Sequence, residues 1–96
     1  MENNRELSAI RADIDLVDDE IVQLFLRRMR LADEVARTKA AMGGGVARPG
    51  REREILARVG NATGDFAPYA TRLFQTLFAL SREYQSSVIT GNGDRS

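Results

Sequence analysis

The sequence contains no cysteine, no histidine and no tryptophan, and only two prolines. Without cysteine the chain can form no disulfide, and without histidine it lacks the commonest general base and metal ligand, so we expect no metal and no cofactor. No run of about 18 apolar residues is present, and the polar start MENNRELSAIRAD lacks an apolar signal-peptide core. We therefore expect a cytoplasmic protein without a membrane span. The formal net charge is zero, so we also expect no nucleic-acid partner.

The composition, 43% hydrophobic and 29% charged over 96 residues, is typical of a folded, helix-rich domain. A chain of this length is near the lower limit for burying a core unaided, which makes a partner chain plausible. We expect one domain over residues 1–90. The polar end at 91–96, within TGNGDRS, is expected to be a frayed tail.

Apolar residues recur every three or four positions in the first half of the sequence, which is the pattern of one helix face. No proline interrupts this stripe and Gly43, Gly44 and Gly45 follow it, so we predict a helix from about residue 5 to 42. Such a helix is roughly 57 Å long, whereas a compact domain of this size has a radius of gyration of about 12–13 Å. We infer a homodimer in which a second copy covers the stripe. The stripe consists of Leu7, Ile10, Ile14, Val17, Ile21, Leu24, Leu31, Val35 and Met42.

Two shorter helices are predicted after the glycines. Pro49 suits a first helical turn, and the apolar residues that follow lead to an expected stop at Gly60. Asp65 is the expected N-cap of a third helix, which tolerates Pro68 in its first turn. This third helix carries one apolar stripe of Leu73, Leu77, Leu80, Tyr84 and Val88 and a second that begins with Phe74 and Phe78. The predicted fold class is all-α, with one long, one short and one medium helix.

Positive charge interrupts the stripe of the long helix. The spacing places Arg28 on the stripe, where a buried guanidinium needs either an acidic partner or a bound anion. Lys39, the only lysine, follows eleven residues later, and eleven steps of about 100° return to nearly the same face. The two side chains could lean toward one small ligand, or Lys39 could be an exposed lysine near a helix end. Arg11 lies about 100° around the helix from Arg28 and would join it more easily from a second subunit.

Polar residues interrupt the third helix in a similar way. Ser81 and Gln85 continue the second stripe by helical spacing, and they could orient a polar ligand or join two helices by hydrogen bonds. Arg51 and Glu52 open the second helix, where they could contact the same ligand or form a solvated face. The lysine and several arginines thus gather near a triple glycine in a chain of zero net charge, and a local site for a small anion would account for them.

Together these residues resemble the all-helical (AroQ-type) chorismate mutases over roughly residues 5–88. The resemblance is carried by LSAIRADIDLVDDEIVQLFLRRMRLADEVARTKAAMGGGV, by REREIL and by the spacing of TRLFQTLFALSREYQ. It implies three helices and an intertwined homodimer with two active sites, each of which uses residues of both chains. It also implies the rearrangement of chorismate to prephenate, the branch step toward phenylalanine and tyrosine, without a nucleophile.

The resemblance assigns roles to four residues in particular. Arg28 matches an arginine that grips a substrate carboxylate within one subunit, and Arg11 matches one that the second subunit supplies. Lys39 matches a lysine that contacts both a carboxylate and the ether oxygen of chorismate. Gln85 matches the residue that donates a hydrogen bond to the same ether oxygen from the other side.

Further residues line the implied site. Glu52 matches the acceptor for the substrate hydroxyl, Arg51 its neighbour in the site wall, and Ser81 a secondary carboxylate contact. Arg48 stands where many family members have an aspartate, and it cannot accept a hydrogen bond from that hydroxyl. Either Glu52 suffices alone or Arg48 turns outward and pairs with it. We expect Arg48→Asp to leave the fold intact and to change KM modestly.

Two other functions fit a helical chain of this kind. An isochorismate pyruvate-lyase shares the fold and a similar cationic site, and assays with both substrates would distinguish it from the mutase. A catalytically silent dimerisation or regulatory module would use the apolar stripe alone, and chorismate would then shift no melting curve. The set of Arg11, Arg28, Lys39, Glu52 and Gln85 favours the mutase.

Overall fold

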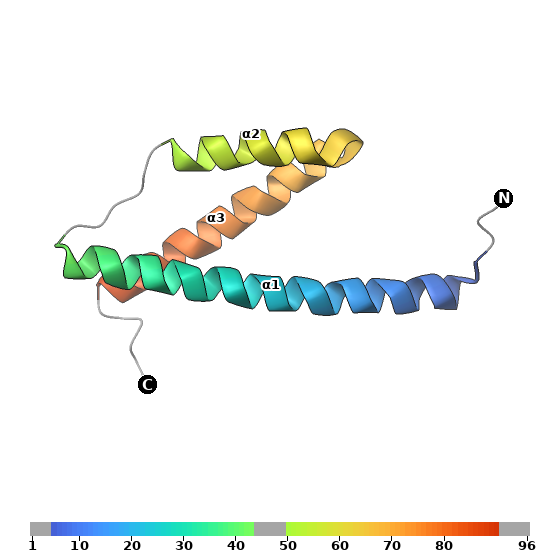
Figure 1. Cartoon of the computed structure of the whole chain (residues 1–96), viewed down its shortest axis with the longest axis horizontal. Coiled ribbons are helices and arrows are strands. Elements are labelled where there is room, and N and C mark those ends of the chain that lie inside the picture. The colour runs from blue at the N-terminus through green and yellow to red at the C-terminus, as the bar shows by residue number, and fades with distance from the viewer. Residues whose placement is uncertain (1–4, 44–49, 91–96) are drawn as a thin grey trace. The chain divides into compact units, whose positions relative to one another are not determined.

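The computed structural model describes residues 5–43 and 50–90, and the regular structure in these ranges is entirely helical. Figure 1 shows the order of the elements along the chain. Helix α1 spans Leu7–Ala41, α2 spans Arg51–Thr63, the 3-10 turn η1 spans Gly64–Phe66 and α3 spans Ala67–Ile89. The all-α prediction is confirmed for the described residues.

The helical elements fall into two continuous stretches of sequence, 7–41 and 51–89. In the second stretch the 3-10 turn η1 joins α2 directly to α3 and reverses the direction of the chain (Figure 1). The prediction of a third helix that begins separately with Asp65 as its N-cap is therefore wrong. Asp65 lies inside η1, and Phe66 precedes α3 without a side-chain cap hydrogen bond. Pro68 lies in the first turn of α3, as predicted.

The expected helix stop at Gly60 is also wrong, because α2 continues through this residue to Thr63. The chain leaves the α-helix at Gly64, where φ is 55° and ψ is −126°, a combination that glycine adopts without a steric clash. Glycine inside a helix costs only about 1 kcal/mol relative to alanine. The neighbouring Val59 is buried in the core, so packing favours continuing the helix past Gly60.

Helix α1 agrees with its predicted bounds to within two residues at each end. Gly43 adopts a φ of +82°, and its N–H donates to the Ala40 carbonyl at 3.1 Å. The first of the three glycines therefore follows the last helical turn in the left-handed conformation expected of a helix stop. Several predictions fall outside the described residues, namely those for Gly44, Gly45, Arg48, Pro49 and the tail 91–96.

Residues up to Leu31 form one compact unit, and residues from Ala32 onward form a second. The second unit has a small apolar core in which Ile55 and Val59 of α2 pack with Phe78 of α3. Phe74 adds an edge-to-face ring contact with Phe78, with ring centroids 6.2 Å apart and an interplanar angle of 66°. This core holds α2 against α3 and fixes which face of α3 points inward.

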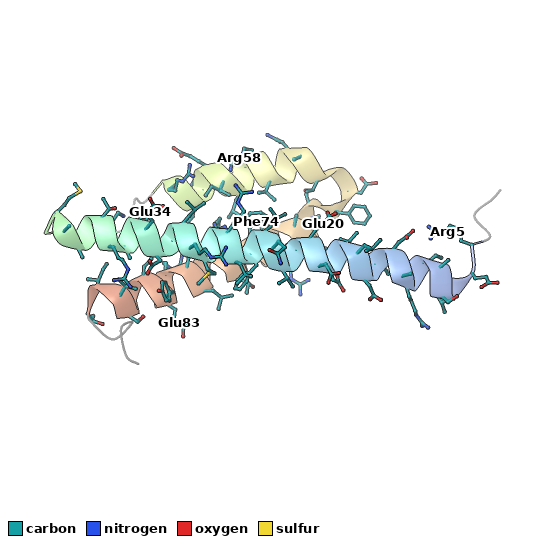
Figure 2. All side chains as sticks on the ribbon, turned by 60° about the horizontal axis from the view of Figure 1, so that its bottom comes forward. Arg5, Glu20, Glu34, Arg58, Phe74 and Glu83 are labelled. Carbon is teal, nitrogen blue, oxygen red and sulfur yellow. The ribbon has the colours of Figure 1, made fainter. Side chains whose placement is uncertain are left out.

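The first unit consists mainly of the long N-terminal part of α1, and its apolar stripe is exposed in the single chain. Figure 2 shows side chains radiating around this helix, with Arg5 just before its first turn and Glu20 near the middle of the unit. The exposed fractions are 58% for Leu7, 51% for Ile14, 53% for Val17, 56% for Ile21 and 59% for Leu24. None of the helices that the structure describes combines the length and apolar character that crossing a bilayer requires.

Candidate functional site

The last turns of α1 and the C-terminal half of α3 meet in the second unit. Ala32 and Ala36 are buried on α1, with exposed fractions of 7% and 1%. The Nε2 of Gln85 on α3 donates a hydrogen bond to the Ala32 carbonyl at 3.2 Å. Small alanine side chains allow the polar group of one helix to reach the backbone of the other. The predicted site residue Gln85 therefore lies at a contact between α1 and α3.

The Gln85 contact is the helix-joining hydrogen bond that the sequence left open as an alternative to ligand binding. The two functions are compatible, because a glutamine amide has two N–H donors. One donor holds the Ala32 carbonyl, and this fixes the plane of the amide. The second N–H of the amide is a further donor.

Lys39 lies in the last turn of α1 and is half-buried. It follows Ala32 by seven residues and Ala36 by three, so at about 100° per residue the three lie within about 60° of one another around the helix. Lys39 therefore shares the face of α1 that carries the Gln85 contact. Its positive charge also suits the C-terminal end of a helix.

Ser81 lies one helical turn before Gln85 and is buried, with 9% of its surface exposed. It is on the face of α3 that also carries the buried Phe78. The prediction that Ser81 and Gln85 continue the Phe74 and Phe78 stripe is confirmed by this burial pattern, since Phe74 and Gln85 are half-buried. The inward face of α3 thus changes from apolar to polar toward its C-terminal end.

Glu52, in the first turn of α2, forms an ion pair with Arg82 of α3. The two side chains are 40% and 53% exposed, so the pair contributes about 0–1 kcal/mol to stability. The carboxylate keeps further acceptor positions for a ligand. No local pattern indicated Arg82 as the partner of Glu52, because the two are 30 residues apart. The adjacent Arg51 is exposed.

A second polar group joins α1 to α3 beside the Gln85 contact. The Tyr84 hydroxyl donates to Oδ1 of Asp33 at 2.7 Å, and Nε of Arg37 donates to Oδ1 and Oδ2 at 3.1 and 3.0 Å. The hydrogen bonds from Arg37 and then from Tyr84 lower the pKa of Asp33 below its ordinary 3.8. The hydrogen bond to Asp33 raises the pKa of Tyr84 above its ordinary 10.0.

Sequence reasoning placed Tyr84 on an apolar stripe and missed this group. The i, i+4 spacing of Asp33 and Arg37 was an available signal for part of it, whereas Tyr84 is 51 residues away from Asp33. Of the predicted site residues, Arg11 and Arg28 lie in the first unit, where Arg11 is exposed and Arg28 is half-buried. The second unit contains Lys39, Arg51, Glu52, Ser81 and Gln85, and Arg48 lies outside the described residues.

The hydrogen-bonding groups of the candidate site suit an anionic ligand. Within residues 5–43 and 50–90, no three carboxylates gather as a metal ion would require. The candidate site in the second unit instead offers an ammonium group on Lys39, an amide on Gln85 and a hydroxyl on Ser81. These groups can donate hydrogen bonds to carboxylate or ether oxygens.

The described residues thus define an all-helical protein whose candidate site is rich in hydrogen-bond donors. The chain belongs to the chorismate mutase type II family, whose family model matches residues 10–86. This range includes every predicted site residue. Comparisons with curated protein sequences and with solved structures give no significant match.

Proposed function

We propose that this chain is a chorismate mutase that converts chorismate to prephenate in the cytoplasm, for the synthesis of phenylalanine and tyrosine. The observation that carries the proposal is the family match over residues 10–86. Arg11, Arg28, Lys39 and Gln85 all lie within it. The proposed substrate is a small dianion, and no cofactor is needed.

The proposed reaction takes place within one molecule. The ether C–O bond of chorismate breaks while a new C–C bond forms, and no proton needs to move. Two demands follow for the protein: it must hold a flexible dianion in a compact geometry, and it must stabilise negative charge that develops on the ether oxygen. Neither demand requires the thiol or imidazole groups that this sequence lacks.

Lys39 and Gln85 are proposed to act on the ether oxygen. The Lys39 ammonium supplies a positive charge, and the Gln85 amide supplies the N–H that its hydrogen bond to the Ala32 carbonyl leaves over. Donors that are already oriented before the reaction stabilise the transition state without reorganisation. The contact between Gln85 and Ala32 therefore supports a catalytic role for the amide.

The remaining residues are proposed to bind and orient the substrate. Guanidinium groups suit this task because they hold carboxylates through two parallel hydrogen bonds. Arg28 would grip one carboxylate, and an Arg11 from the second chain would grip the other. Glu52 would accept a hydrogen bond from the substrate hydroxyl. Secondary contacts with the substrate would come from Ser81, Arg51 and Arg48.

The proposed enzyme is an intertwined homodimer in which each site uses residues of both chains. The exposed stripe on α1 supports this part of the proposal, because soluble monomers rarely leave so extended an apolar face in water. A second copy would cover the stripe. It would also bring in the Arg11 that α1 places far along the helix from Lys39.

Chorismate consumption by the purified chain, followed by absorbance with prephenate identified as product, tests the function. We expect turnover that falls by at least about 100-fold in Lys39→Ala and in Arg28→Ala, since each change removes a charge that contacts the developing or fixed negative charges. Arg30→Ala is the matched control, because Arg30 is exposed on the same helix. It should retain nearly full activity.

Two results would contradict the proposal. Turnover of isochorismate with release of pyruvate, and none of chorismate, would identify a lyase. A folded dimer that turns over neither substrate and shows no rise in Tm with chorismate would identify a silent helical module, because a ligand that binds only the folded state raises Tm.

A further inference from the structure

We propose that Asp33, Arg37 and Tyr84 form a positioning clasp that fixes α1 against α3 in the register in which Lys39 and Gln85 act together. This inference rests on the proposed function, because it assigns the three residues a role in that reaction. They are positioning residues, since they are proposed to act through Lys39 and Gln85 and not on the substrate.

Asp33 is the centre of the clasp, because it accepts hydrogen bonds from both of the other residues. Asp33 accepts one hydrogen bond from Tyr84 of α3, at 2.7 Å, and a bifurcated one from the Nε–H of Arg37 one turn along α1, with N···O distances of 3.1 and 3.0 Å. Arg37 thus orients the carboxylate, and the carboxylate in turn holds the tyrosine hydroxyl. Charge-assisted hydrogen bonds of this kind are shorter and stronger than neutral ones.

The clasp is adjacent in sequence to the residues that it is proposed to position. Tyr84 directly precedes Gln85 on α3, and Asp33 directly follows Ala32, whose carbonyl accepts the Gln85 hydrogen bond. Arg37 precedes Lys39 by two residues. The two hydrogen bonds between the helices therefore tie the same turn of α1 to the same turn of α3.

The burial of small side chains on this part of α1 explains why a clasp is needed. Ala32 and Ala36 are the buried residues of α1, and a methyl group makes no directional bond that could fix the position of a helix. Helices held by apolar burial alone can slide or rotate slightly at little cost. Directional hydrogen bonds remove that freedom, and a displacement of about 1 Å at a catalytic group can cost about 100-fold in rate.

The exposure of the clasp separates this role from a role in stability. The side chains of Asp33 and Arg37 are 30% and 52% exposed, and ion pairs in such positions add little to folding free energy. Loss of the clasp should therefore affect the geometry of the reaction more than the stability of the fold. This difference can be measured.

The test compares Tyr84→Phe with Tyr69→Phe, the same change at the only other tyrosine of the chain. Tyr69 lies on the same helix and is 66% exposed. We expect Tyr84→Phe to lower kcat by about tenfold, with KM within about twofold of the parent and Tm lower by no more than a few degrees. Tyr69→Phe should match the parent in all three quantities. Rates are measured well below the Tm of every variant.

A double-mutant cycle with Asp33→Ala tests whether the two residues act as a unit. Tyr84→Phe should have little further effect on kcat once Asp33 has been replaced, because the hydrogen bond is already gone. Asp33→Asn keeps an oxygen acceptor without the charge and should restore part of the rate lost in Asp33→Ala.

Three outcomes would overturn the clasp. The first is an unchanged kcat in Tyr84→Phe, and the second is independent effects of the two substitutions in the cycle. The third is a fall in Tm without a fall in kcat, which would show a purely structural role. An inactive parent would instead overturn the proposed function and the catalytic role of the clasp with it, so the two failures are distinguishable.

Discussion

Asp33 and Tyr84 share a hydrogen bond that is strongest when the carboxylate is ionised and that needs the phenol to keep its proton. Folding lowers the pKa of Asp33 from 3.8, so this group contributes stability above pH 3.8 that is lost as the pH falls through the lower, folded value. Folding raises the pKa of Tyr84 from 10.0, so this group contributes stability below pH 10.0 that is lost as the pH rises through the higher, folded value. The contribution of the pair is therefore complete only between these two limits.

We predict a corresponding pH dependence in thermal melts. The difference in Tm between the parent and Tyr84→Phe should be constant from about pH 5 to 9, and it should shrink in more acidic and more alkaline buffers. Melts from about pH 2.5 to 11.5 would measure it, with Tyr69→Phe as the control. A difference that is the same at all pH values would show that the hydroxyl does not interact with an ionised Asp33.

At the level of elements, two glycines in the second helical stretch have opposite roles. Gly60 lies inside α2, whereas Gly64 has a φ of 55° where α2 gives way to η1. A Cβ added at either position would meet no atom within 4 Å. The two positions therefore differ in backbone conformation and not in the space available for a side chain.

We predict that Gly60→Ala stabilises the fold and that Gly64→Ala destabilises it. Alanine at position 60 should raise the free energy of unfolding by about 0.5–1 kcal/mol through helix propensity. At position 64 it should lower that free energy by about 1–3 kcal/mol, because a residue with a Cβ is strained there. Urea unfolding at one chain concentration would measure both changes. Equal effects of the two substitutions would contradict the assignment of Gly64 as the turning residue.

The same two glycines show how far the sequence could specify the elements. Periodicity was sufficient for α1 and for the polar continuation of the inward face of α3 at Ser81 and Gln85. It could not distinguish the glycine that ends α2 from the one inside it, because the burial of Val59 against Phe78 decides between them. The hydrogen bond between Tyr84 and Asp33 was similarly beyond local pattern, since packing brings together residues 51 positions apart.

For the molecule as a whole, the main feature is that the described residues form a small apolar core and leave a long apolar stripe exposed. The described part of the chain buries few apolar side chains, and all of these lie in the second unit. The longer part of α1 leaves its apolar stripe exposed. A second copy of the chain is the proposed cover for this stripe.

We predict that a charge on the stripe separates the subunits of the proposed dimer. Ile14→Asp should raise the dissociation constant of the dimer by about 100-fold or more, because an unpaired charge in an apolar interface costs several kcal/mol. Gln23→Asp adds the same charge about 140° around the helix from the centre of the stripe and is the matched control. Sedimentation velocity over a range of concentrations would measure both variants. Dissociation of both, or of neither, would contradict the proposed dimer face.

Lys39 combines two features, since it is the only lysine of the chain and it lies half-buried in the last turn of α1. An amine-directed acylating reagent therefore has a single side-chain target. Acylation removes the positive charge from that side chain, so it should abolish the proposed mutase activity in proportion to the fraction labelled, and chorismate should slow the labelling. Mass spectrometry of the labelled fragment would then give the fraction of chains labelled at Lys39, so the proposed site can be counted without introducing a substitution.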